Sequence, residues 1–334
     1  MAGSRDPGKA FSANRIGFST WMLGVALMAT GALLLLASRS VAIAVGALPR
    51  DVGPVWESIL ALTFLTIGAL VAARRPRNVI GWTFCAAGLT GAFAFAAEQY
   101  GLYARHVRHG ALPWGTVLAW AGWIWFPALA SALAALFLLF PDGHLLSRRW
   151  RPAAWLVAGA IVAASWETAL APLPRYLGTN PVKLTGLAAA VARVLDPLVW
   201  LVVMPAAMLA AVAALVVRFR RSRGDERQQL KWLVYAGALL VLPFITAIAL
   251  LLLSEVGWVP PVWVDALELP IGGLLLLAIV GMPVAAGVAI LRYRLYDIDR
   301  LINRTLVYAT LTAVLGLGYA ASVVVMGQLF GRHR

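Results

Sequence analysis

The sequence predicts an all-α protein, a polytopic bundle of about nine transmembrane helices. Hydrophobic residues fill 62% of the 334 positions and charged residues only 13%, and the mean hydropathy is +0.83. Soluble domains are about half apolar and about a quarter charged, so a chain this apolar must meet lipid. The net charge of +14 comes from short basic clusters between apolar runs. Such clusters are typical of membrane topology signals and argue against a nucleic-acid partner.

A helix is expected wherever about 20 apolar residues run together, the length that crosses ~30 Å of hydrocarbon. A polar tail, residues 1–17, precedes the first run, which is too long for a signal-peptide core and predicts an uncleaved helix. Residues 18–330 form the expected transmembrane domain, and 331–334 are its C-terminal end. The connection 173–194 predicts a turn followed by a short amphipathic or interfacial segment. The expected spans are 18–38, 55–73, 79–102, 114–140, 153–172, 197–217, 232–254, 269–291 and 306–329.

The basic residues lie mainly in alternate connections. Of the 28 Lys and Arg residues, 19 fall in the N-terminal tail and in every second connection after it. Cytoplasmic connections are the ones enriched in Lys and Arg, so the N-terminus is expected in the cytoplasm. Nine spans then place the C-terminus outside, where Arg332 and Arg334 fit poorly. Either one of the spans is wrongly placed, or the chain is truncated before a further, returning span, and we favour truncation.

Ionisable residues inside the spans are costly in hydrocarbon and are the first candidates for a functional pocket. A glutamate near the outer end of the third span and another in the outer half of the fifth could line a pocket or carry a proton. Alternatively, each reaches the outer interface and pairs with a nearby arginine. The neighbouring aromatic residues could bind a small apolar or lipid ligand, or simply pack between helices. The candidate pocket comprises Glu98, Tyr100, Tyr103, Trp166 and Glu167.

Signatures of enzymes and metal sites are missing from the sequence. It contains no phosphate-binding loop, no zinc-protease motif and no nucleophile elbow. Cys85 is the only cysteine, so neither an internal disulfide nor a cysteine-based metal site is expected. His106 and His109 would share a helix face, but a solvated loop position is the simpler interpretation. We expect no catalytic residue, no metal and no cofactor in this chain.

Two basic segments on the predicted cytoplasmic side are the expected interface and signal relay. In the first, Asp225 and Gln228 have capping-box spacing, so Gly224 should break the chain and Asp225 should start the seventh helix. In the second, an aspartate can cap the ninth helix, and two arginines lie one turn apart at the headgroup level. The predicted relay residues are Arg223, Asp225, Gln228, Arg294, Asp297, Asp299, Arg300 and Arg304.

Four motifs stand out, each next to a predicted cytoplasmic connection. They are RRPRNVIGW at 74–82, LLFPDGHLLSRRWRP at 138–152, RGDERQQLKW at 223–232 and GVAILRYRLYDIDRLINRTLVY at 287–308. In order and spacing they resemble the membrane region of multipass bacterial sensor histidine kinases, chiefly of actinobacterial type. Each motif is short, but their combination is specific, and the resemblance covers most of the chain from about residue 55 onward.

The resemblance implies a sensor or anchoring region in the bacterial inner membrane. Such a region relays a membrane or extracellular signal to a cytoplasmic kinase region through shifts of packed helices. In that family the spans precede a phosphoacceptor helix pair, which forms a homodimer, and an ATP-binding domain. This catalytic half is not in the sequence, in agreement with the expected truncation. Alternatives from other classes are a small-molecule or lipid transporter and an inert membrane subunit of a complex.

Overall fold

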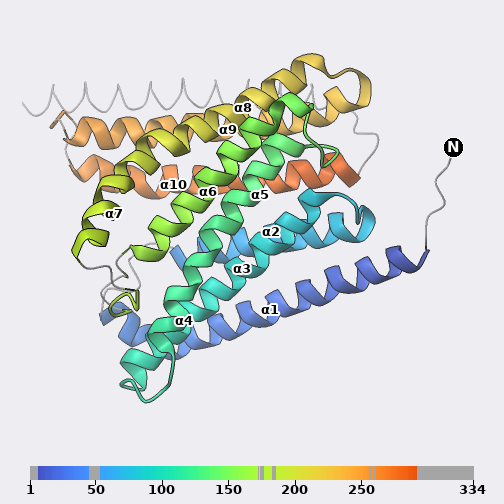
Figure 1. Ribbon diagram of the computed structural model, residues 1–334. Coiled ribbons are helices and arrows are strands. Elements are labelled where there is room, and N and C mark those ends of the chain that lie inside the picture. Colours follow the sequence, from blue (N-terminus) through green and yellow to red (C-terminus); the bar gives the residue numbers. More distant parts are fainter. Residues whose placement is uncertain are drawn as a thin grey trace, which may run out of the picture. The chain divides into compact units, whose positions relative to one another are not determined.

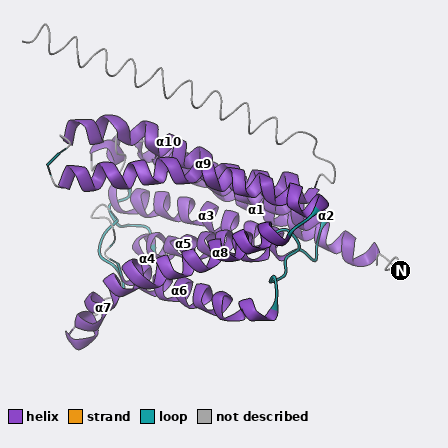
Figure 2. Cartoon of the chain, turned by 90° about the horizontal axis from the view of Figure 1, so that it is seen from above, coloured by secondary structure: helices purple, strands orange, loops and turns teal. Residues whose placement is uncertain are grey.

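The computed structural model consists of helices joined by short connections (Figure 1). Within the residues that it describes there is no β-strand, and the predicted all-α class is confirmed for them. Figure 2 shows the same helices from above. The described residues are 7–44, 53–171, 173, 177–182, 186–255, 257–258 and 261–291.

Ten α-helices and four short 3₁₀ or π segments make up this part of the chain. The 3₁₀ segments are η2 and η3, and the π segments are η1 and η4. In order, the elements are α1 (Pro7–Ala44), α2 (Gly53–Arg74), α3 (Val79–Leu102), η1 (Tyr103–Val107), α4 (Gly115–Ala121), η2 (Gly122–Ile124), α5 (Trp125–Leu139), η3 (Arg148–Trp150), α6 (Arg151–Leu170), α7 (Gly186–Leu198), η4 (Val199–Val203), α8 (Met204–Arg221), α9 (Gly224–Glu255) and α10 (Pro261–Leu291).

Six helices among the described residues are long and apolar enough to cross a membrane, and they indicate a membrane protein. They coincide with the first five expected spans and with the eighth. The expected spans 197–217 and 232–254 also fold as helices but are not among the six, and 306–329 lies outside the described residues. The six are Arg15–Ser40, Val55–Arg74, Val79–Val107, Gly115–Leu139, Arg148–Leu170 and Pro270–Leu291.

Helices α2 and α3 approach backbone to backbone because glycines line their contact. A Cβ atom added at Gly88 of α3 would overlap the backbone nitrogen of Leu65 in α2. A Cβ atom added at Gly68 of α2 would likewise overlap the backbone nitrogen of Cys85 in α3. Small residues commonly allow membrane helices to pack this closely. We call this contact the glycine seam.

Helix α1 packs against both members of this pair. The indole Nε1 of Trp21 donates to the Thr66 hydroxyl of α2 at 3.1 Å. Gly31 lies against the Phe95 ring of α3. Helices α1, α2 and α3 therefore form one closely packed group.

One hydrophobic core cluster joins α2, α3, α5, α8, α9 and α10. It lies mainly near the helix ends that carry the basic connections: Val71 is near the end of α2 and Ile80 near the start of α3. In it, the Phe64 and Phe84 rings pack edge to face with centroids 5.1 Å apart. Close-packed protein interiors have low compressibility and transmit strain. The buried members are Phe64, Val71, Ile80, Phe84, Ala87, Ala132, Leu136, Phe140, Leu215, Leu230, Leu233, Ala236, Met282, Ala285, Ala286, Ala289 and Ile290.

Helix α6 packs on α5 and α8 through small side chains, among them Ala160 of α6 and Ala211 of α8. Its opposite face is open: Trp155 is 76% exposed and Val162 69% exposed. The predicted amphipathic segment after α6 is confirmed as helix α7, which is followed by η4 beside α6. Helix α6 thus has one packed face and one face available to lipid or to a ligand.

Candidate functional site

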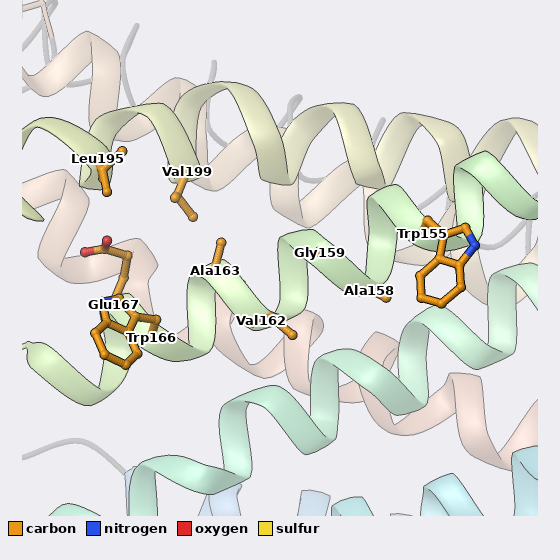
Figure 3. A pocket seen from close by; sticks show the side chains of 9 residues that line it. All are labelled: Trp155, Ala158, Gly159, Val162, Ala163, Trp166, Glu167, Leu195 and Val199. Carbon is orange, nitrogen blue, oxygen red and sulfur yellow. The ribbon is translucent and has the colours of Figure 1, made fainter.

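A groove runs along the open face of α6, opposite the end of α7 and the start of η4 (Figure 3). Its volume is about 610 Å³. Trp155 lies at one end of the groove, and Trp166 and Glu167 lie at the other. Leu195 and Val199 line the side that faces α6. Apart from Glu167 and the two indoles, the lining is aliphatic, so the groove suits an alkyl chain with a polar group at one end. We call it the α6 groove.

The polar end of the α6 groove carries the carboxylate of Glu167, and a second carboxylate, that of Asp196, lies nearby. Glu167 is partly buried, and it is close enough to Asp196 of α7 to interact with it electrostatically. In the described part of the chain, neither carboxylate forms an ion pair with a basic side chain. Among the residues that line the groove, the ionisable one is therefore the carboxylate of Glu167.

Hydrogen bonds fix the end of α6 that carries Glu167. The indole Nε1 of Trp120 donates to the Ala169 carbonyl at 2.8 Å. The Asn180 side-chain amide donates to the same carbonyl at 2.9 Å and to the Ala171 carbonyl at 2.7 Å. The last carbonyls of a helix have no partner within the helix, so these two donors supply hydrogen bonds that the helix itself cannot.

The other three residues of the predicted pocket lie elsewhere. Glu98, Tyr100 and Tyr103 belong to α3 and η1, and none of them lines the α6 groove. The Tyr100 hydroxyl donates to the Pro113 carbonyl at 3.0 Å. Glu98 is close enough to Glu57 of α2 to interact with it electrostatically. The structure therefore brings Trp166 and Glu167 together in one groove and places Glu98, Tyr100 and Tyr103 along α3 and η1.

Gln99 lies between Glu98 and Tyr100 of the predicted pocket, but the sequence analysis does not single it out. Its side chain is only 4% exposed. Among the described residues, its Oε1 atom has no hydrogen-bond partner. A buried amide inside a predicted span could have been singled out by the same cost argument as the glutamates.

At the helix ends that carry the basic connections, Asn78 links α3 to the connection between α5 and α6. Its Oδ1 atom accepts the Ile80 backbone N–H at 3.0 Å and caps α3. Its Nδ2 atom donates to the Pro141 carbonyl at 3.0 Å. Asparagine is among the preferred N-cap residues, and this one also makes a bond 63 residues away in the sequence.

Arg218, in the last turn of α8, is bound to the same connection. Its side chain is 5% exposed, and its guanidinium donates to the carbonyl oxygens of Phe140 and, at 2.6 Å, of His144. A buried charge is costly unless polar groups surround it, and the planar guanidinium offers five donors. We call Asn78, Phe140, Pro141, His144 and Arg218 the basic-end node.

The basic-end node lies beside the core cluster, which all four basic motifs share. Motif 74–82 contributes Ile80, and motif 138–152 contributes Phe140, whose carbonyl also belongs to the node. Motif 223–232 contributes Leu230, and motif 287–308 contributes Ile290. Segments that are separate in the sequence thus meet in one packed unit.

The predicted relay residues lie partly in this region. Arg223 is exposed directly before α9, and Gln228 is half-buried in the first turns of α9. Asp225 is in the first turn of α9. The predicted break is confirmed at Gly224, where φ is +56° and α9 begins. The other five predicted relay residues lie outside the described residues: Arg294, Asp297, Asp299, Arg300 and Arg304.

No metal site is evident in the part of the chain that the structure describes, since it holds no group of three His, Cys, Asp or Glu side chains. Comparisons with models of protein families, with curated proteins and with solved structures found no match.

Proposed function

We propose that this chain is the membrane-embedded sensor and anchoring region of a two-component sensor histidine kinase. In this proposal it lies in the bacterial inner membrane in nine spans, with its N-terminus and basic connections in the cytoplasm. It relays a signal from the membrane or from outside to a cytoplasmic kinase region, which forms a homodimer. The chain itself carries no catalytic step.

The convergence of the four motifs is the observation that carries the proposal. These motifs are the basis of the resemblance to sensor kinases, and each places a buried side chain in the core cluster: Ile80, Phe140, Leu230 and Ile290. A relay needs its cytoplasmic segments to be mechanically connected, because coupling passes through packed side chains and hydrogen bonds. The core cluster and the basic-end node supply such a connection.

The relay would run from α6 to α10. A displacement of α6 changes the connection that precedes it, and Arg218 ties that connection to the end of α8. Helix α9 starts three residues after α8 ends, and it packs against α10. Helix α10 in turn precedes Arg294, the first relay residue predicted in the fourth motif. Small helix shifts of this kind are a common switching movement.

A transporter is the alternative, and the groove favours it less. Transport requires a polar site near the middle of the membrane. The carboxylate of the α6 groove belongs to Glu167, three residues before the end of a helix whose middle is aliphatic at this face. A transporter would lose uptake with Glu167→Ala, whereas unchanged uptake would remove this residue from that role.

The gene provides the first test of the proposal. We expect the reading frame, followed past the codon for Arg334, to encode a phosphoacceptor helix pair and an ATP-binding domain. Membranes that contain the complete product should then incorporate phosphate from γ-labelled ATP into a histidine. A stop codon directly after Arg334, with no kinase gene beside it, would contradict the proposal.

The relay is tested separately on the same membranes. Arg218→Met removes the donors of the basic-end node, and we expect it to lock the histidine phosphorylation at a signal-independent level. Arg220→Met, which changes an exposed arginine in the same turn of α8, is the matched control and should behave as the unmodified protein. Equal behaviour of both variants would remove Arg218 from the relay.

A further inference from the structure

The α6 groove combines three properties that bear on what it could bind. It is long, because Trp155 and Glu167 are 12 positions apart on α6, which corresponds to about 18 Å along a helix. It is aliphatic along this length, with Gly159 and Val162 in its lining. It ends at an acidic group (Figure 3).

We propose that the α6 groove binds a single-chain amphiphile with a cationic headgroup, such as an alkylammonium. The alkyl chain lies along α6 toward Trp155, and the headgroup lies between Glu167, Asp196 and the Trp166 ring. This assignment deepens the proposed function by naming the class of ligand, and in that respect it rests on the sensor proposal. Binding itself requires no kinase and is measured directly.

Charge complementarity decides the headgroup. Glu167 lines the end of the groove, and Asp196, next to the lining residue Leu195 in α7, is close enough to interact with it electrostatically. A cation between them would relieve their mutual repulsion. Trp166, whose side chain is 62% exposed, lies beside Glu167 in Figure 3. A tryptophan face attracts ammonium groups, quaternary ones in particular.

The shape of the groove decides the tail. Nothing lies within 4 Å of the position that a Cβ atom would take at Gly159, so the middle of the groove has room beside the helix backbone. Ala158 and Ala163 are also small and line the groove. A second helix would need to bury a broader apolar face, whereas one alkyl chain fits a strip of small residues that ends in a carboxylate. The occupant we expect is therefore a single chain.

Photo-crosslinking tests the proposal on the full 334-residue chain. The protein is placed in nanodiscs of digalactosyldiacylglycerol, a neutral lipid without an ammonium group. The probe is dodecyltrimethylammonium that carries a diazirine at the end of its alkyl chain. We expect labelling within residues 155–163, competed by unlabelled dodecyltrimethylammonium. Three compounds should compete at least tenfold less well. Dodecanol has the alkyl chain but no charge, dodecanoate has the chain but a negative charge, and tetramethylammonium has the positive charge but no long chain.

Three variants separate the contributions to binding. Gly159→Leu places an isobutyl group in the groove at a position where a Cβ atom meets nothing within 4 Å, and it should abolish the labelling. Gly281→Leu on α10 is the matched control, because a Cβ atom there also meets nothing within 4 Å, and its labelling should be unchanged. The double variant Glu167→Gln, Asp196→Asn keeps the shape and removes the charge, and it should weaken competition by the ammonium probe at least fivefold.

The other possible occupants give different results. Equal competition by dodecanol, with no effect of the Glu167 and Asp196 changes, would mean an ordinary bilayer acyl chain and would overturn the proposal. Crosslinks between two copies through α6 in place of lipid labelling would mean a dimer interface and would also overturn it. Specific labelling without any effect on histidine phosphorylation would support the site while contradicting the sensor function, so the two proposals fail separately.

Discussion

Arg218 donates from its buried guanidinium to the carbonyl oxygen of Phe140, which lies 78 residues earlier in the chain. The same side chain reaches the His144 carbonyl at 2.6 Å. Both acceptors are main-chain carbonyl groups. The contact therefore fixes the backbone path between α5 and α6 and does not depend on which side chains residues 140 and 144 carry. The end of α8 thereby holds the connection between α5 and α6 in one conformation.

Removing the Arg218 donors should destabilise the protein. Arg218→Met keeps most of the apolar volume but leaves the Phe140 and His144 carbonyls without this donor. Unmatched buried groups and lost charged hydrogen bonds cost a few kcal/mol, and we expect a loss of about 3 kcal/mol in the free energy of unfolding. Unfolding in bicelles with increasing SDS, followed by circular dichroism, measures the loss. Arg220→Met is the control, and a comparable loss there would show that the arrangement around Arg218 is unimportant.

The two bonds of Asn78 can be separated by substitution. Asn78→Asp keeps an acceptor for the Ile80 N–H but has no donor for the Pro141 carbonyl, and should cost about 1 kcal/mol. Asn78→Ala also loses the N-cap and should cost about 1 kcal/mol more. The same unfolding assay distinguishes the two variants. If both were equally stable, the capping bond would contribute nothing.

Asn78 and Arg218 should be energetically coupled, because both bind the connection between α5 and α6. Once one of them is replaced, the connection can move and the other loses part of its effect. Coupling energies between residues that share a partner reach about 0.5–3 kcal/mol. The double variant Asn78→Asp, Arg218→Met should therefore be more stable than the sum of the single losses predicts. Simple additivity would mean that the two residues act independently.

Gly88→Ala should destabilise the glycine seam. The added methyl group meets the Leu65 backbone, which cannot rotate away as a side chain can. We expect a cost of about 1–3 kcal/mol, typical of an overpacked core. Gly159→Ala is the matched control in α6, where the methyl group meets nothing within 4 Å and alanine favours the helix by about 0.5–1 kcal/mol. A stable Gly88→Ala protein would show that α2 and α3 are less closely packed than described.

The orientation of the chain can be tested with topology reporters. A reporter fused after Arg223 should read cytoplasmic, because it follows the connection richest in arginine. A reporter fused after Val262, beyond α9, should read external. Alkaline phosphatase and green fluorescent protein, which are active on opposite sides of the bacterial inner membrane, give complementary signals. Reversed signals at both positions would contradict the proposed orientation.

Six helices that are long and apolar enough to cross a membrane could be predicted from the sequence, because a run of about 20 apolar residues is the signature of such a helix. Interruptions within these helices could not be predicted in the same way. The expected span 114–140 is interrupted by the 3₁₀ segment Gly122–Ile124, and Pro127 then lies in the first turn of α5. Proline is tolerated there because the first N–H groups of a helix need no partner in it. A proline in an apolar run can therefore mark a new helix start as well as a kink.

The parts of the candidate site differ in how far the sequence could reveal them. Asn78 carries a readable signal, since an asparagine directly before an apolar run is a typical N-cap. Arg218 carries none: it resembles its neighbour Arg220, and only the approach of Phe140 distinguishes them. Glu167 was identified by its cost in hydrocarbon, but Asp196 is 29 positions away and no periodicity connects them. Such tertiary pairings are not encoded in any local pattern.

The glycine seam has a consequence for how the protein is made. Helices α2 and α3 are separated by only four residues, and the atoms that would clash with a larger side chain belong to the partner helix alone. Contacts between neighbours in the sequence form early, because little chain entropy is lost in closing the loop. We expect this hairpin to assemble while the ribosome is still translating α5. The later helices would then be added against a surface that is already in place.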